Sequence, residues 1–119
     1  MPDNYISIPD ENGSINISED VIAVICSEAV AEVDGVASQA STVGGELQEL
    51  FGKKHISKGV KVSFEDGEII LDTLVMIRYG VGISTVAAKV QDAVITAVES
   101  MTGLKPRVNV HISGVAFEK

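Results

Sequence analysis

The stretch VKVSFEDGEIILDTLVMIRY, residues 60–79, decides the fold. Apolar and polar residues alternate over residues 60–65, which is the pattern of a strand with one buried face. Asp66-Gly67 follows, and both residues tolerate the positive φ angles of a two-residue hairpin turn. Residues 69–79 then carry apolar side chains on both faces, which is typical of a central strand. The sequence therefore predicts an antiparallel hairpin at the centre of a sheet.

An amphipathic helix is predicted on each side of this hairpin in the chain. The first begins at Ser18, whose hydroxyl can cap it, and ends at Gly35. The second follows the turn at residues 80–82, with Ser84 as its cap, and ends at Gly103. Spacings of three and four residues predict one buried stripe on each helix. The stripes are Ile22, Ile25, Cys26, Ala29, Val30 and Val33 in the first helix, and Val86, Val90, Ala93, Val94, Ala97 and Met101 in the second.

Strands are also predicted at residues 14–17 and 108–112, and Gly114 marks a bulge in the last strand. The resulting order, β-α-β-β-α-β, favours an α+β two-layer sandwich of ferredoxin-like type. In this fold one mixed or antiparallel sheet carries two helices on one face. We interpret residues 13–119 as a single domain with a long loop at about residues 37–59. Residues 1–12 are interpreted as a flexible N-terminal lead-in.

Composition and charge narrow the classes of function. Seventeen acidic and nine basic residues give a formal net charge of −8, and such a field repels nucleic-acid phosphates and anionic lipids. The aromatic residues are two Tyr and three Phe, with no Trp, which leaves few rings for stacking bases. No apolar run approaches the roughly 20 residues of a spanning helix. The sequence predicts a cytoplasmic protein that binds no nucleic acid and does not itself insert into a membrane.

Residue types that carry chemistry are few and scattered. Cys26 is the only cysteine and lies in an apolar stripe, so we interpret it as a buried structural residue. His55 falls in the predicted loop and His111 on the polar face of a strand, without the spacing of a metal site. The acidic residues around Gly67 belong to a hairpin tip and lack the spacing of a calcium loop. The sequence therefore predicts no catalytic residue, no metal site and no cofactor.

Candidates for contact with a partner come from the helices and from the predicted loop. Val24 and Ile95 lie opposite the predicted apolar stripes, where a protein partner or a second copy of the chain could contact them. Residues 47–51 form a short amphipathic turn followed by lysines, which suits docking on a protein or on a membrane surface. The same turn could instead close one end of the core. The candidates in the loop are Leu47, Leu50, Phe51, Lys53 and Lys54.

Gly80, Gly82 and Ser84 are the candidates for binding a small anion. Glycines before a helix allow backbone N–H groups to converge on a negative group at the positive end of the helix dipole. The third glycine of a dinucleotide-binding fingerprint is missing, so simple turn formation is the alternative interpretation. A regulatory binding module for an anionic metabolite is therefore the alternative function. Nucleic-acid binding through residues 53–58 is a further alternative, which the net charge disfavours.

Six short segments between residues 13 and 117 form an ordered pattern. They are Gly13-x-Ile15-x-Ile17-Ser18, Val33-x-Gly35-Val36, Lys58-Gly59-Val60-x-Val62, Tyr79-Gly80, Val90-Gln91-x-x-Val94 and Thr102-Gly103-Leu104. Together they resemble the alkaline-shock (envelope stress response) family of Gram-positive bacteria. The resemblance implies a cytoplasmic protein of cell-envelope homeostasis or, in other branches, lipid synthesis, which self-associates and acts through small membrane-anchoring partners. We therefore expect a non-enzymatic adaptor or scaffold that works by protein–protein contacts on the cytoplasmic side of the membrane.

Overall fold

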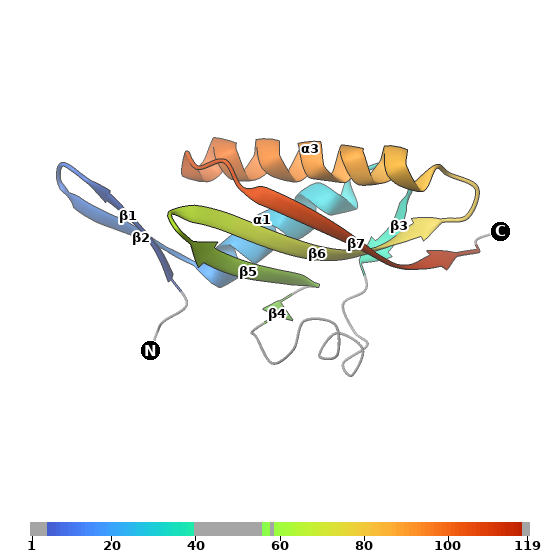
Figure 1. The fold of residues 1–119 in the computed structure, drawn as a ribbon, viewed down its shortest axis with the longest axis horizontal. Coiled ribbons are helices and arrows are strands. Elements are labelled where there is room, and N and C mark those ends of the chain that lie inside the picture. The colour runs from blue at the N-terminus through green and yellow to red at the C-terminus, as the bar shows by residue number, and fades with distance from the viewer. Residues whose placement is uncertain (1–4, 40–55, 58, 118–119) are drawn as a thin grey trace.

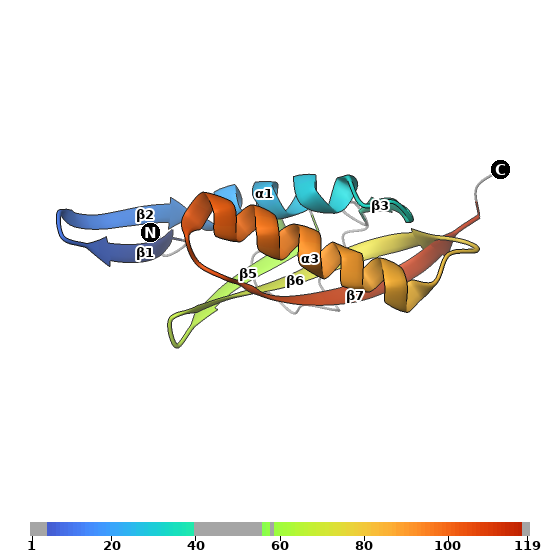
Figure 2. The ribbon, with the colours of Figure 1, turned by 90° about the horizontal axis from the view of Figure 1, so that it is seen from above.

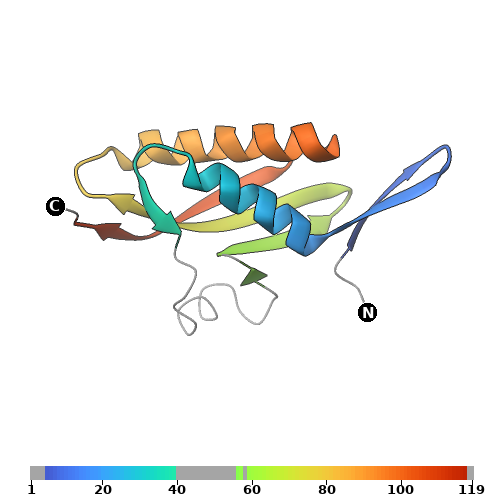
Figure 3. The same cartoon turned by 180° about the vertical axis from the view of Figure 1, so that it is seen from behind.

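The computed structural model describes residues 5–39, 56–57 and 59–117 (Figure 1). The two helices within these ranges, α1 (Glu19–Ala31) and α3 (Ile83–Thr102), run antiparallel and cover the same face of the main sheet (Figure 2). Seen from behind, α1 crosses in front of the strands, and α3 runs above it (Figure 3). This two-layer arrangement confirms the predicted α+β fold class.

The main sheet is built around the long strand β6 (Glu68–Arg78). On one edge, β7 (Arg107–Ala116) pairs with it in parallel. On the other edge, β5 (Val60–Glu65) pairs antiparallel with the first half of β6, and β3 (Val36–Gln39) pairs antiparallel with the second half. The short strand β4 (Ile56–Ser57) continues the sheet beyond β5. The sheet is therefore mixed, and β6 is central as the sequence predicts.

The predicted first strand takes a different place. Strand β2 (Gly13–Ser18) pairs antiparallel with β1 (Tyr5–Asp10) in a separate hairpin that projects from one end of the molecule (Figure 1). The main sheet instead contains β3, which pairs with β6 and lies inside the segment predicted as a loop. Four residues are too short to show an alternation, which is why β3 escapes detection. Residues 5–10, interpreted as a lead-in, form β1, and Ile6 is buried against the core.

The hydrophobic core lies between the helices and one face of the sheet. Strand β6 contributes Ile69, Leu71, Val75 and Ile77, which are spaced by two along its helix-facing side. The helices contribute a stripe of residues spaced by four, with Ala23 of α1 buried beside it, and this stripe is narrower than the sequence predicts. Its members are Ile22, Cys26 and Val30 from α1, and Val86, Val90, Val94 and Val98 from α3.

The remaining predicted stripe residues are less buried than the core residues. Met101, which the sequence predicts to be buried, is 67% exposed, and Val98 takes the core position one turn along the buried stripe. Residues 25, 29, 33, 93 and 97 are half-buried. On a helix, residues three and four positions apart lie next to each other on the surface. The residues three positions after each core residue therefore form a second stripe beside the buried one. The first stripe is fully buried on the sheet, and the second is only partly covered.

The turns and helix ends follow local chemistry. Asp66 and Gly67 have φ angles of 53° and 78°, which confirms the two-residue hairpin turn. Gly103 ends α3 in the left-handed conformation, as predicted. The end of α1 differs from the prediction, because its cap is Glu32 and Gly35 instead turns the chain into β3.

The predicted bulge in β7 is also present. Ile112 pairs with Val75, and Gly114 pairs with the next residue of β6, Met76. Ser113 is therefore an extra residue, and its hydroxyl donates a 3.2 Å hydrogen bond to the carbonyl of Val75. The bulge lets Val115 pair with Ile77. Beyond the strand, the rings of Tyr79 and Phe117 lie 4.7 Å apart.

Candidate functional site

A groove of about 790 Å³ runs between the two helices on the side away from the sheet. Its apolar walls are the second stripes of the helices, which the core covers only in part. One wall carries Ile25, Ala29 and Val33, and the other carries Ala93, Ala97 and Met101. Because alanines stand at the middle of both walls, the groove remains open between the helix backbones.

Val24 is the one predicted contact residue that lies in this groove. It is 41% exposed and borders the wall formed by α1. Ile95, predicted to lie opposite the core stripe, is half-buried and packs against the hydrophobic core. The predicted pair of exposed residues is therefore reduced to one. Leu47, Leu50, Phe51, Lys53 and Lys54 lie outside the described residues, and their role stays a prediction.

Three carboxylates line the groove, and sequence reasoning missed them. Glu28 and Glu32 border it from the α1 side, and Asp92 borders it from α3. No Lys, Arg or His is among the described residues that line it. The signal that could have revealed this site is the second apolar stripe of each helix together with acids at its margin.

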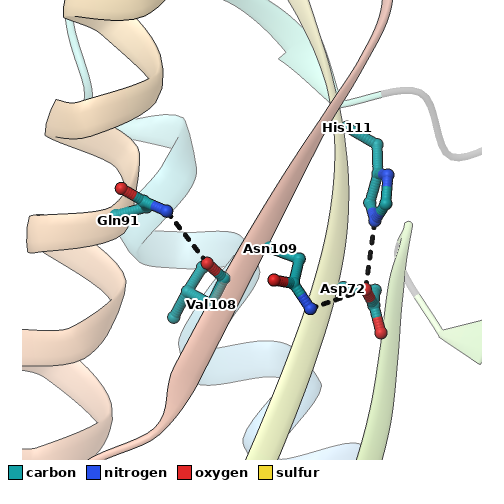
Figure 4. Close-up of polar contacts among 5 residues, drawn as sticks. All are labelled: Asp72, Gln91, Val108, Asn109 and His111. Carbon is teal, nitrogen blue, oxygen red and sulfur yellow. Dashed lines mark hydrogen bonds and ion pairs between the residues drawn. The ribbon is translucent and has the colours of Figure 1, made fainter.

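The open face of the sheet carries a small polar cluster centred on Asp72 of β6. Its Oδ1 accepts a 3.1 Å hydrogen bond from Asn109 Nδ2 and lies 3.0 Å from His111 Nε2 (Figure 4). Because a carboxylate only accepts hydrogen bonds, Nε2 is the donor. Lys61 pairs with Asp72 in the ladder from the neighbouring strand. These side-chain contacts join β6 to β7. The cluster is therefore explained by its role in holding the two strands together.

The buried thiol of Cys26 faces the sheet from α1. Burial raises the pKa of this thiol to about 12, and the nearby Thr73 hydroxyl acts weakly in the opposite direction. The Thr73 hydroxyl makes no hydrogen bond of normal geometry with a described residue, and a thiol is at best a weak partner for it. The thiol is buried, as the sequence predicts, and the raised pKa keeps it protonated at neutral pH.

The predicted anion-binding residues lie at the start of α3. The N-cap is Gly82, whose backbone is extended, and Ser84 lies in the first turn with no capping role. Gly80 has a φ angle of 100° and no described atom within 4 Å of a Cβ added there. This arrangement is what turn formation alone produces. The anion-binding role of Gly80, Gly82 and Ser84 therefore stays a prediction.

The described part of the chain contains neither a cluster of metal ligands nor a membrane-spanning helix. Among residues 5–39, 56–57 and 59–117, no three His, Cys, Asp or Glu side chains gather as metal ligands would. Within the same ranges, no helix has the length and apolar character needed to cross a membrane.

Similarity to proteins of known fold is limited to architecture. A single-substitution variant of the MamM CTD superimposes with a TM-score of 0.50 over 81% of this chain and 96% of that one, at 14% identity. At this level of identity the likeness concerns the fold alone.

Sequence relatives are closer. The uncharacterized protein YqhY of Bacillus subtilis (strain 168) is 38% identical over 107 residues, which cover 89% of this chain and 79% of YqhY. The uncharacterized protein YloU of the same strain is 34% identical over 113 residues, which cover 92% of this chain and 94% of YloU. The profile of the ASP23 (alkaline-shock protein) family, described by a cell envelope-related function, matches residues 7–117. The resemblance seen in the six sequence segments is thereby confirmed, and the chain belongs to the ASP23 family.

Proposed function

We propose that the chain is a non-enzymatic adaptor or scaffold of cell-envelope homeostasis and stress response. It acts through protein–protein contacts on the cytoplasmic side of the membrane, where a small membrane-anchored protein holds it. The observation that carries this proposal is the groove between α1 and α3, with Val24 and Met101 exposed at its borders. Exposed apolar side chains around a concave surface are a common mark of a protein-binding site.

The family supports the setting of this proposal, because its function is related to the cell envelope. The net charge of −8 supports a protein partner over direct adsorption to the membrane, since anionic head groups repel an acidic surface. The described residues that line the groove are mainly apolar side chains and carboxylates, a composition that suits contact with a partner of opposite charge.

Affinity capture from gently solubilised membranes of the host, with washes at high salt, tests the proposal. Wild-type protein should retain one specific membrane protein, and Val24→Asp should lose it because a carboxylate then enters the apolar border. Val21→Asp is the matched control, since Val21 is 46% exposed on the same helix but lies outside the groove. Retention of no membrane protein by the wild type, or equal loss by both variants, would contradict the adaptor function.

A further inference from the structure

Each helix carries more apolar surface than the sheet can cover. In α3, the stripe from Val86 to Val98 is buried on the sheet, and the neighbouring stripe at positions 93, 97 and 101 opens into the groove. In α1, the stripe from Ile22 to Val30 is buried, and positions 25, 29 and 33 open into the same groove. The two partly exposed stripes run along a common channel, as the facing stripes of a helical bundle do when one helix is missing.

Small side chains determine what shape fits this channel. Ala29, Ala93 and Ala97 leave room at the middle of the groove, while Ile25 and Met101 form larger apolar borders. A third helix laid between two others needs this arrangement, because its side chains must enter between the two backbones. Helix-in-groove recognition uses apolar anchors spaced by three, four and seven residues, which matches the spacing of the groove walls.

The charges at the groove determine which charge its occupant must carry. Glu28 and Glu32 are four residues apart on α1, a spacing at which like charges repel across one turn. Both lie in or just beyond the last turn of α1, where the negative end of the helix dipole disfavours acids and where no basic residue is present. Asp92 adds a third negative charge from α3. The structure shows no ion pair between these three carboxylates and any residue that it describes.

We propose that this groove binds an amphipathic helix of a partner protein, with an apolar face between two borders of Lys and Arg. The inference rests on the proposed adaptor function and identifies the chemistry of its partner. Cytoplasmic segments next to membrane-spanning helices are enriched in Lys and Arg, so an anchored partner carries the charges that the groove lacks. A second copy of this acidic chain, an anionic membrane and a nucleic acid would all be repelled by the same carboxylates.

A synthetic probe tests the inference without knowledge of the natural partner. The probe is a fluorescein-labelled helical peptide with Leu at every third and fourth position and Lys along both borders of that face. A peptide of the same composition in scrambled order keeps the charge and loses the apolar face. Fluorescence anisotropy at low and at high salt then separates the apolar contribution from the charge contribution, because salt screens only the second.

Two sets of variants locate the binding. The triple variant Glu28→Lys, Glu32→Lys and Asp92→Lys reverses the groove charge, and it changes the net charge by 3 × 2, from −8 to −2. The matched control is Glu11→Lys, Glu65→Lys and Glu99→Lys, which makes the same net change at exposed positions outside the groove. Thr96→Trp places a ring in the groove from an exposed position on α3 and leaves the charges unaltered.

The expected result is binding of the probe by the wild type and by the control triple variant. The groove triple variant and Thr96→Trp should each weaken it by about tenfold or more, equivalent to about 1.4 kcal/mol, with unchanged circular dichroism. Equal binding of the scrambled peptide, equal loss in the control triple variant, or no binding by the wild type would overturn the inference. Two further results would overturn the inference. The first is wild-type binding to phosphatidylglycerol vesicles that the groove triple variant loses, and the second is wild-type self-association that the same variant loses. If the probe alone fails, the membrane capture with Val24→Asp and Val21→Asp still tests the adaptor function separately.

Discussion

The side-chain amide of Gln91 donates a 3.0 Å hydrogen bond to the backbone carbonyl of Val108, and thereby ties α3 to β7 (Figure 4). Among the described strands, β7 pairs only with β6, so it is an edge of the sheet. Edge strands expose backbone groups to unwanted pairing with other chains. Gln91 gives one of these carbonyls a partner and fixes the helix over the strand.

Gln91→Ala should lower the free energy of unfolding by about 1 kcal/mol, the usual net contribution of a hydrogen bond of this kind. Gln91→Glu should lower it at least as much near neutral pH, because a carboxylate cannot donate to the carbonyl. Urea unfolding followed by circular dichroism measures both. Lys89→Ala, at a neighbouring exposed position of α3, is the control and should change the stability by less than about 0.5 kcal/mol. An effect of Gln91→Ala no larger than that of the control would contradict the role of this bond.

Gly35→Ala should be among the most destabilising substitutions of a small residue in the chain. Gly35 has a φ angle of 102°, and a Cβ added there would lie 2.7 Å from Cγ2 of Val86. Val86 is buried and β-branched, so it has little freedom to move away. Backbone strain and overpacking together predict a loss of about 2–4 kcal/mol.

Gly67→Ala separates these two effects. Gly67 has a φ angle of 78°, but no described atom lies within 4 Å of an added Cβ. The backbone strain alone predicts a loss of about 1 kcal/mol. Thermal and urea unfolding of both variants should therefore show Gly35→Ala as clearly the more destabilised, and equal losses would show that the contact with Val86 contributes nothing.

Thr73→Val should stabilise the protein by about 0.5–1 kcal/mol, because it removes a fully buried hydroxyl that has no good hydrogen-bond partner and keeps the shape of the side chain. Thr102→Val should have the opposite effect. The Thr102 hydroxyl donates to the carbonyl of Val98 at 2.8 Å and accepts from the backbone N–H of Leu104 at 3.1 Å. Its removal predicts a loss of about 1–2 kcal/mol. Calorimetric unfolding of the two variants should give shifts of opposite sign, and a loss in Thr73→Val would reveal a bonded hydroxyl.

Cys26 makes the stability depend on pH in the alkaline range. The thiol has a pKa of about 12 in the folded protein and 9.0 in an unperturbed chain, because burial disfavours its anion. Above about pH 9 the unfolded chain loses this proton while the folded protein keeps it, so stability falls with rising pH until about pH 12. From about pH 8 to about pH 10, wild-type protein should lose about 1 kcal/mol more than Cys26→Ala. Parallel losses in urea unfolding of the two proteins would mean that the thiol has no part in the pH dependence.

Local patterns in the sequence predicted the centre of the fold well. The hairpin at Asp66-Gly67, the two-faced strand β6 and the helix end at Gly103 all depend on residues close in sequence, and all are present. The partner of β6 beside β5 could not be predicted in this way. Strand β3 has four residues, and its pairing with Val75–Ile77 of β6 spans a large separation in sequence, which no local pattern records.

The groove could be predicted only in part, because it also depends on contacts between segments far apart in the sequence. Apolar periodicity shows that Ala93 and Met101 lie near the core residues of α3, but the width of the buried stripe depends on how closely the sheet approaches. Val24 was recognised because it lies opposite the sheet. The importance of Glu28 and Asp92 depends on the distance between two helices, and helix periodicity holds no information on that distance.

The extra residue Ser113 is absorbed by the bulge in β7. Side chains along a regular strand point to alternate faces, so an insertion without a bulge would move every later side chain to the opposite face. The bulge prevents this, because Gly114 pairs with Met76 directly after the pair of Ile112 and Val75, and Val115 then lies opposite Ile77. Deleting Ser113 would leave these pairs intact and would remove the hydrogen bond from its hydroxyl to the carbonyl of Val75. The register of the C-terminal half of β7 therefore tolerates the loss of this one residue, while the local bend of the strand would be lost with it.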